Sequence, residues 1–100
     1  MKVKNNYIDV LQALQESQIK LDLTKDIWYY VNGNPRCVLR VAKPNSFDSY
    51  ADVVAKITLY YDNKMLWEVL ITVDTDLEKF VEKLKKKIST VKTTRKDFGL

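Results

Sequence analysis

The chain has 100 residues, of which 46% are apolar and 30% are charged, and its formal charge is +4. This composition excludes a disordered or fibrous chain and favours one packed domain. Histidine is absent, glycine occurs twice and Cys37 is the only cysteine. These counts argue against histidine-based triads, phosphate-binding glycine loops, most zinc sites and an internal disulfide.

We therefore expect a protein that is not an enzyme and that uses no cofactor or metal. Two acidic patterns have simpler explanations than a metal site: residues 74–78 precede an expected helix, and Asp62-Asn63-Lys64 forms an expected turn. No apolar run is long enough to span a membrane, and no signal-peptide pattern opens the chain. Because a chain with a single cysteine can form no internal disulfide, which fits a reducing compartment, we expect a cytoplasmic protein.

The N-terminal quarter combines a helical pattern with a strand pattern. Apolar residues at spacings of three and four predict a helix over about Tyr7–Ser17, capped by Asn5 or Asn6. This stripe consists of Val3, Tyr7, Val10, Leu11 and Leu14. Residues 19–23 then alternate between apolar and charged side chains, which predicts a short, half-buried strand with an exposed edge.

Two runs of strand-forming residues, 27–31 and 36–41, predict a first hairpin around the turn Asn32–Pro35. With a four-residue loop, the side chains that point toward the core are Trp28, Tyr30, Cys37, Leu39 and Val41. The outward side chains are then Tyr29, Arg36, Val38 and Arg40. Because this outward group combines cations with an aromatic ring, we interpret it as a candidate protein interface. The alternative is an ordinary exposed sheet surface.

A second hairpin is predicted around the turn Asp62–Lys64, because the flanking residues alternate between apolar and polar. Its inward pairs are Tyr61 with Met65, Leu59 with Trp67, Ile57 with Val69, Ala55 with Ile71 and Val53 with Val73. The opposite side carries Lys56, Thr58, Glu68 and Thr72. Between the hairpins, Pro44–Asp52 is expected to form a loop, with Phe47 and Tyr50 packing back over the sheet.

The sequence Thr75-Asp76-Leu77-Glu78 is typical of a capping box and predicts the start of the last helix. The apolar arc of that helix consists of Leu77, Phe80, Val81, Leu84, Ile88 and Val91. Residues 92–100 show no such period and predict a basic, flexible tail, so the expected single domain covers residues 1–91. These patterns predict an α+β fold in the order α-β-β-β-β-β-α, with both helices on one face of an antiparallel sheet of about five strands.

The sequence KLKKKISTVKTTRK, residues 83–96, concentrates the basic charge. Residues 1–82 carry ten cations and twelve acids, a net charge of −2, whereas residues 83–100 carry seven cations and one acid, a net charge of +6. The helix dipole favours acids at a helix start and lysines toward its end, which explains most of this pattern. The alternative is nucleic-acid contact through Lys83, Lys86, Lys87, Lys92, Arg95 and Lys96, with Tyr29, Arg36 and Arg40 adding contacts.

The order of a helix, strands and a basic final helix resembles the double-stranded RNA-binding domain. The Lys-Lys-x-Ala-Lys motif of that family is replaced here by the acidic Thr75–Glu78 sequence, so no residue role is carried over. In size, low-GC composition and lack of catalytic residues, the chain also resembles accessory proteins of phages and mobile elements, including inhibitors of bacterial defence systems. This second resemblance implies a small non-catalytic protein, monomeric or homodimeric, that docks on a protein partner.

Overall fold

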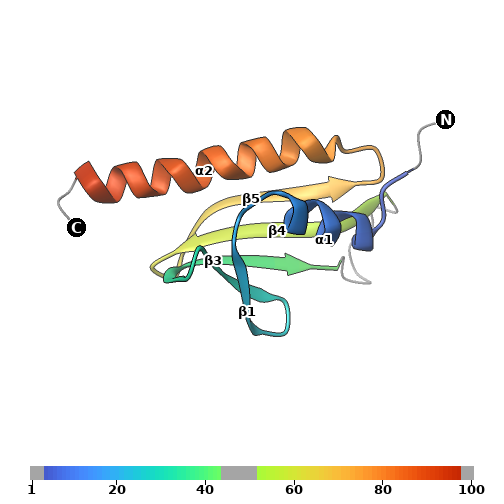
Figure 1. The fold of residues 1–100 in the computed structure, drawn as a ribbon. Coiled ribbons are helices and arrows are strands. Elements are labelled where there is room, and N and C mark those ends of the chain that lie inside the picture. Colours follow the sequence, from blue (N-terminus) through green and yellow to red (C-terminus); the bar gives the residue numbers. More distant parts are fainter. Residues whose placement is uncertain (1–3, 44–51, 98–100) are drawn as a thin grey trace.

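The computed structural model describes residues 4–43 and 52–97, with side chains described as far as residue 90. The elements in chain order are α1 (Tyr7–Glu16), β1 (Leu21–Lys25), β2 (Trp28–Val31), β3 (Asn34–Ala42), β4 (Val53–Tyr61), β5 (Lys64–Thr72) and α2 (Leu77–Asp97). All strands lie in one antiparallel sheet, in the order β1-β2-β3-β4-β5. The predicted α+β fold, with a helix at each end of five strands, is confirmed (Figure 1).

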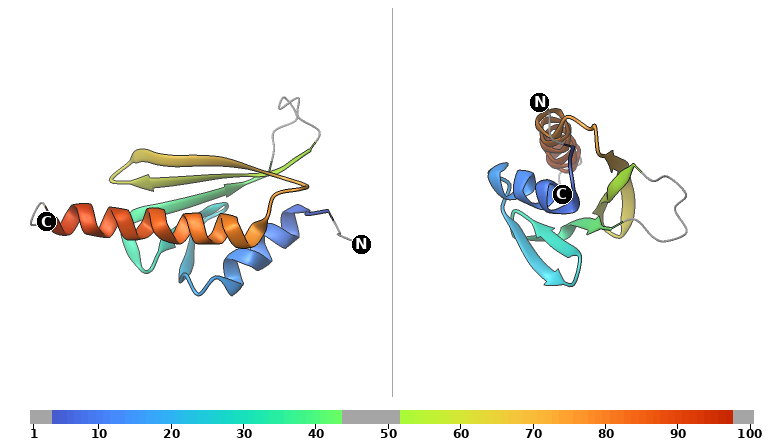
Figure 2. Two further views of the ribbon diagram at one scale, coloured as in Figure 1. Left: turned by 90° about the horizontal axis from the view of Figure 1, so that it is seen from above. Right: turned by 90° about the vertical axis from the view of Figure 1, so that its right-hand side faces the viewer.

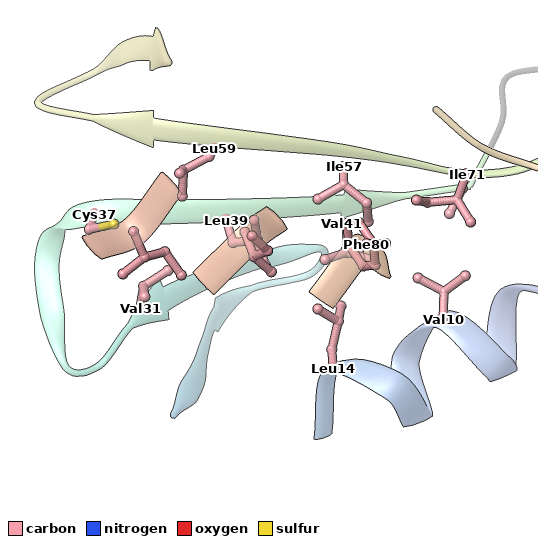
Figure 3. Packing of buried hydrophobic residues seen from close by; sticks show 13 residues of the cluster. Val10, Leu14, Val31, Cys37, Leu39, Val41, Ile57, Leu59, Ile71 and Phe80 are labelled. Carbon is pink, nitrogen blue, oxygen red and sulfur yellow. The ribbon is translucent and has the colours of Figure 1, made fainter. Parts of the chain in front are cut away.

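Both helices pack on one face of the sheet, which we call the inner face; the opposite side is the outer face. Figure 3 shows side chains from the sheet and the helices pointing toward one another in the space between them. This core consists of Val10, Leu14, Val31, Cys37, Leu39, Val41, Ala55, Ile57, Leu59, Ile71, Phe80, Leu84 and Ile88. Burial of these apolar side chains is the main force that holds the helices to the sheet.

Helix α1 is capped by side chains at both ends. Asn6 Oδ1 accepts a hydrogen bond from Asp9 N, and Asp9 Oδ2 accepts one from Asn6 N, both at 2.9 Å. This reciprocal capping box confirms Asn6 as one of the two predicted caps. At the other end, Leu14 O accepts two hydrogen bonds from Ser17, one from its Oγ at 2.5 Å and one from its backbone N at 3.3 Å.

Tyr7 fixes α1 to the sheet. Its hydroxyl donates to Val41 O at 3.0 Å, and Lys43 Nζ lies 5.2 Å from the centroid of its ring. Burial, followed by the charges of Tyr29 and Asp26, raises the pKa of the Tyr7 phenol above its usual 10.0. The folded protein therefore favours the protonated hydroxyl, which is the form that can donate.

Helix α2 is capped by Asp76, and the predicted cap at Thr75 is wrong. Asp76 Oδ1 accepts from Glu78 N at 3.1 Å and from Lys79 N at 3.3 Å. Thr75 has a different role, because its Oγ1 accepts from Thr72 N at 2.8 Å and closes the turn between β5 and α2.

Helix α2 continues to Asp97, whereas the sequence pattern predicts an end near Val91. Residues 92–97, expected in the tail, are therefore helical; they contain no glycine or proline that would stop a helix. The predicted apolar arc packs against the core at Leu77, Phe80, Val81, Leu84 and Ile88, which confirms it at these positions. The side chain of Val91 is not among the described ones. The C-terminal end of α2, red in Figure 2, reaches beyond the adjacent end of the sheet.

The first hairpin has a shorter turn than predicted. Asn32 and Gly33 alone form the turn, with φ values of 52° and 72° that match a primed two-residue turn. The register then shifts along β3 around Pro35, a residue that cannot donate a ladder hydrogen bond and is typical of such irregularities. As a result, Tyr30 lies opposite Val38, one position away from the predicted partner Cys37.

This shift reverses the predicted facing of β2. Trp28 lies opposite Arg40 and Tyr29 lies opposite the fully buried Leu39. Trp28 and Tyr30 therefore belong to the outer face and Tyr29 to the inner face, so these three predictions are wrong. The inward positions predicted on β3 are confirmed: Cys37, Leu39 and Val41.

The second hairpin keeps most of its predicted pairing. Its turn is Asp62–Asn63, with φ values of 52° and 66°, so it is one residue shorter than predicted. An extra residue at Leu66 compensates, and the confirmed pairs are Leu59 with Trp67, Ile57 with Val69 and Ala55 with Ile71. Two pairs near the ends are wrong, because Tyr61 lies opposite Lys64 and Val53 lies opposite Thr72.

Two further predictions concern the first strand and the loop between the hairpins. Strand β1 covers Leu21–Lys25, so it lies two residues later than the predicted strand. The expected loop between the hairpins, with Phe47 and Tyr50, lies outside the described residues except for Asp52.

Candidate functional site

The predicted interface group is divided between the two faces of the sheet. Arg36, Val38 and Arg40 occupy alternate positions of β3 on the outer face. Tyr29 does not join them, because it packs against the core on the inner face. Instead, the structure brings Trp28 and Tyr30 of β2 next to Val38 and Arg40.

An apolar row crosses the outer face over four strands. Tyr30 of β2 lies opposite Val38 of β3, Val38 lies opposite Tyr60 of β4, and Tyr60 lies opposite Met65 of β5. Tyr30 and Met65 are 37% and 59% exposed. The exposed face of an antiparallel sheet is usually polar, so a complete row of large apolar residues is a departure that needs a cause.

Trp28 and Arg40 adjoin this row. The ring of Trp28 lies 5.5 Å from that of Tyr60 at a tilt of 41°, and the Arg40 guanidinium carbon lies 5.7 Å from the Trp28 ring centroid. Such contacts hold large side chains in fixed orientations at a surface. We refer to Trp28, Tyr30, Val38, Arg40 and Tyr60 as the aromatic cluster.

The aromatic cluster borders an open hollow of about 430 Å³. The residues that line it are Thr24, Lys25, Trp28, Tyr30, Pro35, Val38, Tyr60 and Asn63. The hollow is therefore bounded by the end of β1, by β2, by β3, by Tyr60 of β4 and by Asn63 in the second hairpin turn.

The charges of the outer face are largely paired. Arg36 Nε lies 2.6 Å from Asp62 Oδ1, and Lys56 Nζ lies 3.6 Å from Glu68 Oε2. Glu68 also accepts a 3.3 Å hydrogen bond from Thr58, which is fully buried beneath these side chains. The surface is thus a mixed apolar and ionic one, without a strong excess of one sign.

The basic residues predicted to contact nucleic acid lie on α2, away from the outer face. Lys83, Lys86 and Lys87 are exposed, and none forms an ion pair within the described part of the chain. The other three predicted residues, Lys92, Arg95 and Lys96, are in the helix, but their side chains lie outside the description. Helix α2 packs its apolar arc on the inner face and lies on that side of the sheet (Figure 2), whereas the aromatic cluster is on the outer face.

A groove of about 690 Å³ separates the first turns of α2 from α1. Its acidic lining residues are Asp9, Glu16, Glu78 and Glu82. Asp9 is engaged in the α1 capping box, and Glu78 lies in the first turn of α2, where the helix dipole favours an acid. The helix starts therefore account for Asp9 and Glu78, and Glu16 Oε1 accepts a hydrogen bond from Gln12 Nε2 at 3.4 Å.

Sequence reasoning missed Trp28, Tyr30, Tyr60 and Met65 as outer-face residues. The Asn32-Gly33 dipeptide signals the two-residue turn but not the reversed facing, which comes from the register shift along β3; Pro35, which cannot donate a ladder hydrogen bond, was the available signal for that shift.

Comparison of the chain with protein-family models, with curated proteins and with solved structures gives no match. Among residues 4–43 and 52–97, no three acidic or cysteine side chains gather as a metal site would require. No helix in the described part of the chain is long and apolar enough to cross a membrane.

Proposed function

We propose that this protein is a non-catalytic binding protein that docks on a protein partner through the aromatic cluster. The observation that supports this most directly is the apolar row Tyr30, Val38, Tyr60 and Met65, which lies on the sheet face that the helices leave uncovered. Trp28 and Arg40 beside this row add the residue types that most often dominate the binding energy of protein interfaces.

The paired charges of this face also favour a protein partner over a nucleic acid. A polyanion is attracted by an excess of cations, and the outer face holds Asp62 and Glu68 close to two of its cations. The exposed lysines of α2 support nucleic-acid binding as the second candidate function, but they lie on the other side of the molecule. One ligand strand would have to pass around the domain to use both surfaces.

The buried Cys37 fits a reducing compartment, so we place the encounter in the cytoplasm. A component of a bacterial defence system, blocked by an accessory protein of a phage or mobile element, is one partner of this kind.

The test compares the two surfaces in one capture experiment. The double variant Trp28→Ala, Tyr30→Ala should lose the partners that the tagged wild-type protein retains from a lysate of its source cells. The matched control Lys83→Ala, Lys86→Ala should retain them. If the first variant keeps the same partners, docking through the aromatic cluster is wrong.

A titration with DNA and RNA at about 50 and 200 mM salt tests the second function. Tight binding that weakens steeply with salt and is lost in the Lys83→Ala, Lys86→Ala variant would replace the protein-docking proposal. Weak binding at both salt concentrations would indicate that the α2 lysines are an ordinary solvent-exposed helix surface and do not bind nucleic acid.

A further inference from the structure

We propose that the hollow beside the aromatic cluster receives an apolar side chain of the partner, and that carboxylates flanking this side chain pair with Lys25 and Arg40. The partner segment is thus an acidic peptide with an apolar anchor. This inference rests on the proposed docking function and names the chemistry of the partner.

The apolar half of the proposal follows from the lining of the hollow. Trp28, Tyr30, Pro35, Val38 and Tyr60 supply most of its lining residues. Its volume of about 430 Å³ lies toward the lower end of the range in which proteins bind small groups. An apolar side chain that enters this space is desolvated against aromatic rings, which is the usual setting of an interface anchor.

The acidic half of the proposal follows from the outer-face cations that have no carboxylate partner among the described residues. Three carboxylates of the described chain have a cation within 4.0 Å: Asp22 with Lys20, Asp62 with Arg36 and Glu68 with Lys56. In the part of the chain that the structure describes, Lys25 and Arg40 have no carboxylate at that distance. None of the residues that line the hollow is acidic.

The positions of these two cations connect the two halves. Lys25 lines the hollow itself and is paired in the sheet with Trp28. Arg40 lies over the Trp28 ring, next to the same hollow. A peptide that inserts an apolar side chain here therefore brings its neighbouring residues within reach of both cations, where carboxylates form charge-assisted hydrogen bonds.

A peptide fits this arrangement better than a nucleic acid does. Two cations match one or two carboxylates, whereas nucleic-acid affinity depends on several neutralised phosphates. The carboxylates Asp22, Asp62 and Glu68 would also oppose a continuous polyanion, and α2 with its lysines packs on the inner face.

The probe is a short synthetic peptide with one Phe between Asp pairs, compared with the same peptide carrying Lys in place of Asp. Binding is followed by amide chemical shifts of the wild-type protein and by Trp28 fluorescence in a Trp67→Phe variant, in which Trp28 is the only tryptophan. We expect the Asp peptide to bind at least about tenfold more tightly than the Lys peptide, with shifts concentrated in β2, β3 and the Asn63 turn.

Variants of the protein complete the test. Arg40→Ala and Lys25→Ala should each weaken the Asp peptide by up to about tenfold, and the control Lys83→Ala, Lys86→Ala should leave its affinity unchanged. Equal affinity for both peptides, no saturable shift, or displacement of the Asp peptide by an equimolar single-stranded oligonucleotide would each overturn the inference.

The outcomes separate this inference from the proposed function. If Trp28→Ala, Tyr30→Ala abolishes partner capture while the Asp peptide fails to bind, docking stands and the acidic-anchor chemistry is wrong. If that variant keeps its partners, docking through this face fails whatever the peptide does.

Discussion

The two faces of the sheet are built from alternate residues of the same strands, yet only one of them is covered. On the inner face, Leu39 and Leu59 are fully buried beneath the helices. One residue away on each strand, Val38 and Tyr60 continue an apolar row across the outer face with no element of the described chain above it. Apolar residues alone therefore do not make a core. A core also needs a second packed layer, and no described residue forms such a layer over the outer face.

The difference between the two faces is tested by the same truncation at a covered and at an exposed position of the sheet. Leu59→Ala on the inner face should lower the free energy of unfolding by about 2–5 kcal/mol, because it leaves a cavity in a closed core. Leu70→Ala on β5, where the side chain is 46% exposed, should cost less than about 1 kcal/mol. Urea unfolding of both variants measures the difference, and equal losses would show that the outer face is packed in solution as well.

The next largest effect concerns the helix that covers the inner face. Asp76→Ala should lower stability by about 1 kcal/mol, because two amide groups at the start of α2 lose their acceptor. Thermal unfolding gives the change. The matched control is Asp76→Asn, which keeps a capping oxygen and should lose less stability; a loss equal to that of Asp76→Ala would contradict the assigned cap.

Tyr7 gives the contact between α1 and the sheet a pH dependence. Since folding raises the pKa of Tyr7 above 10.0, its stabilising contribution is complete below that pH and is lost as pH rises through the folded-state pKa. Tyr7→Phe should cost about 1 kcal/mol at neutral pH by removing the hydrogen bond to Val41 O. The variant should also lose less stability than the wild type between neutral pH and strongly alkaline pH, as measured by urea unfolding.

The smallest effect is expected on the solvent side of α2. Replacing Lys83, Lys86 and Lys87 by Gln should change the free energy of unfolding by no more than about 0.5 kcal/mol, because these side chains are exposed and form no ion pair with the described residues. Partner capture should be retained. A large stability loss in urea unfolding would mean that these lysines contribute to the fold through contacts other than ion pairs.

The layers of the fold could be predicted from periodicity, because the inward residues of β4 and β5 and the apolar arc of α2 follow the periods of strand and helix. The facing of β2 could not, since a two-residue and a four-residue turn give the same facing, and the reversal comes from the register shift along β3 around Pro35. In the second hairpin an error in turn length was absorbed by the extra residue at Leu66. In the first hairpin, three residues of β3, 35–37, lie between the partners of Val31 and Tyr30; this odd number reverses the facing of β2, so Trp28 was assigned to the wrong face.

The candidate site was therefore predicted only in part. Arg36, Val38 and Arg40 could be placed outward because β3 alternates clearly, but their aromatic neighbours come from other strands. A surface assembled from three or four strands depends on every register between them, so one misplaced residue changes its composition.

Asn5 joins the start of the described chain to the turn between β5 and α2. Its backbone N donates to Val73 O at 2.9 Å, and its side-chain amide donates to Thr75 O at 2.7 Å across 70 positions of sequence. The strands, by contrast, pair only with their neighbours along the chain. Because loop closure over a long separation costs more entropy than local pairing, we expect the sheet to form first and this junction to close last. The N-terminal helix is then the unit that can detach and rejoin while the meander of strands stays intact.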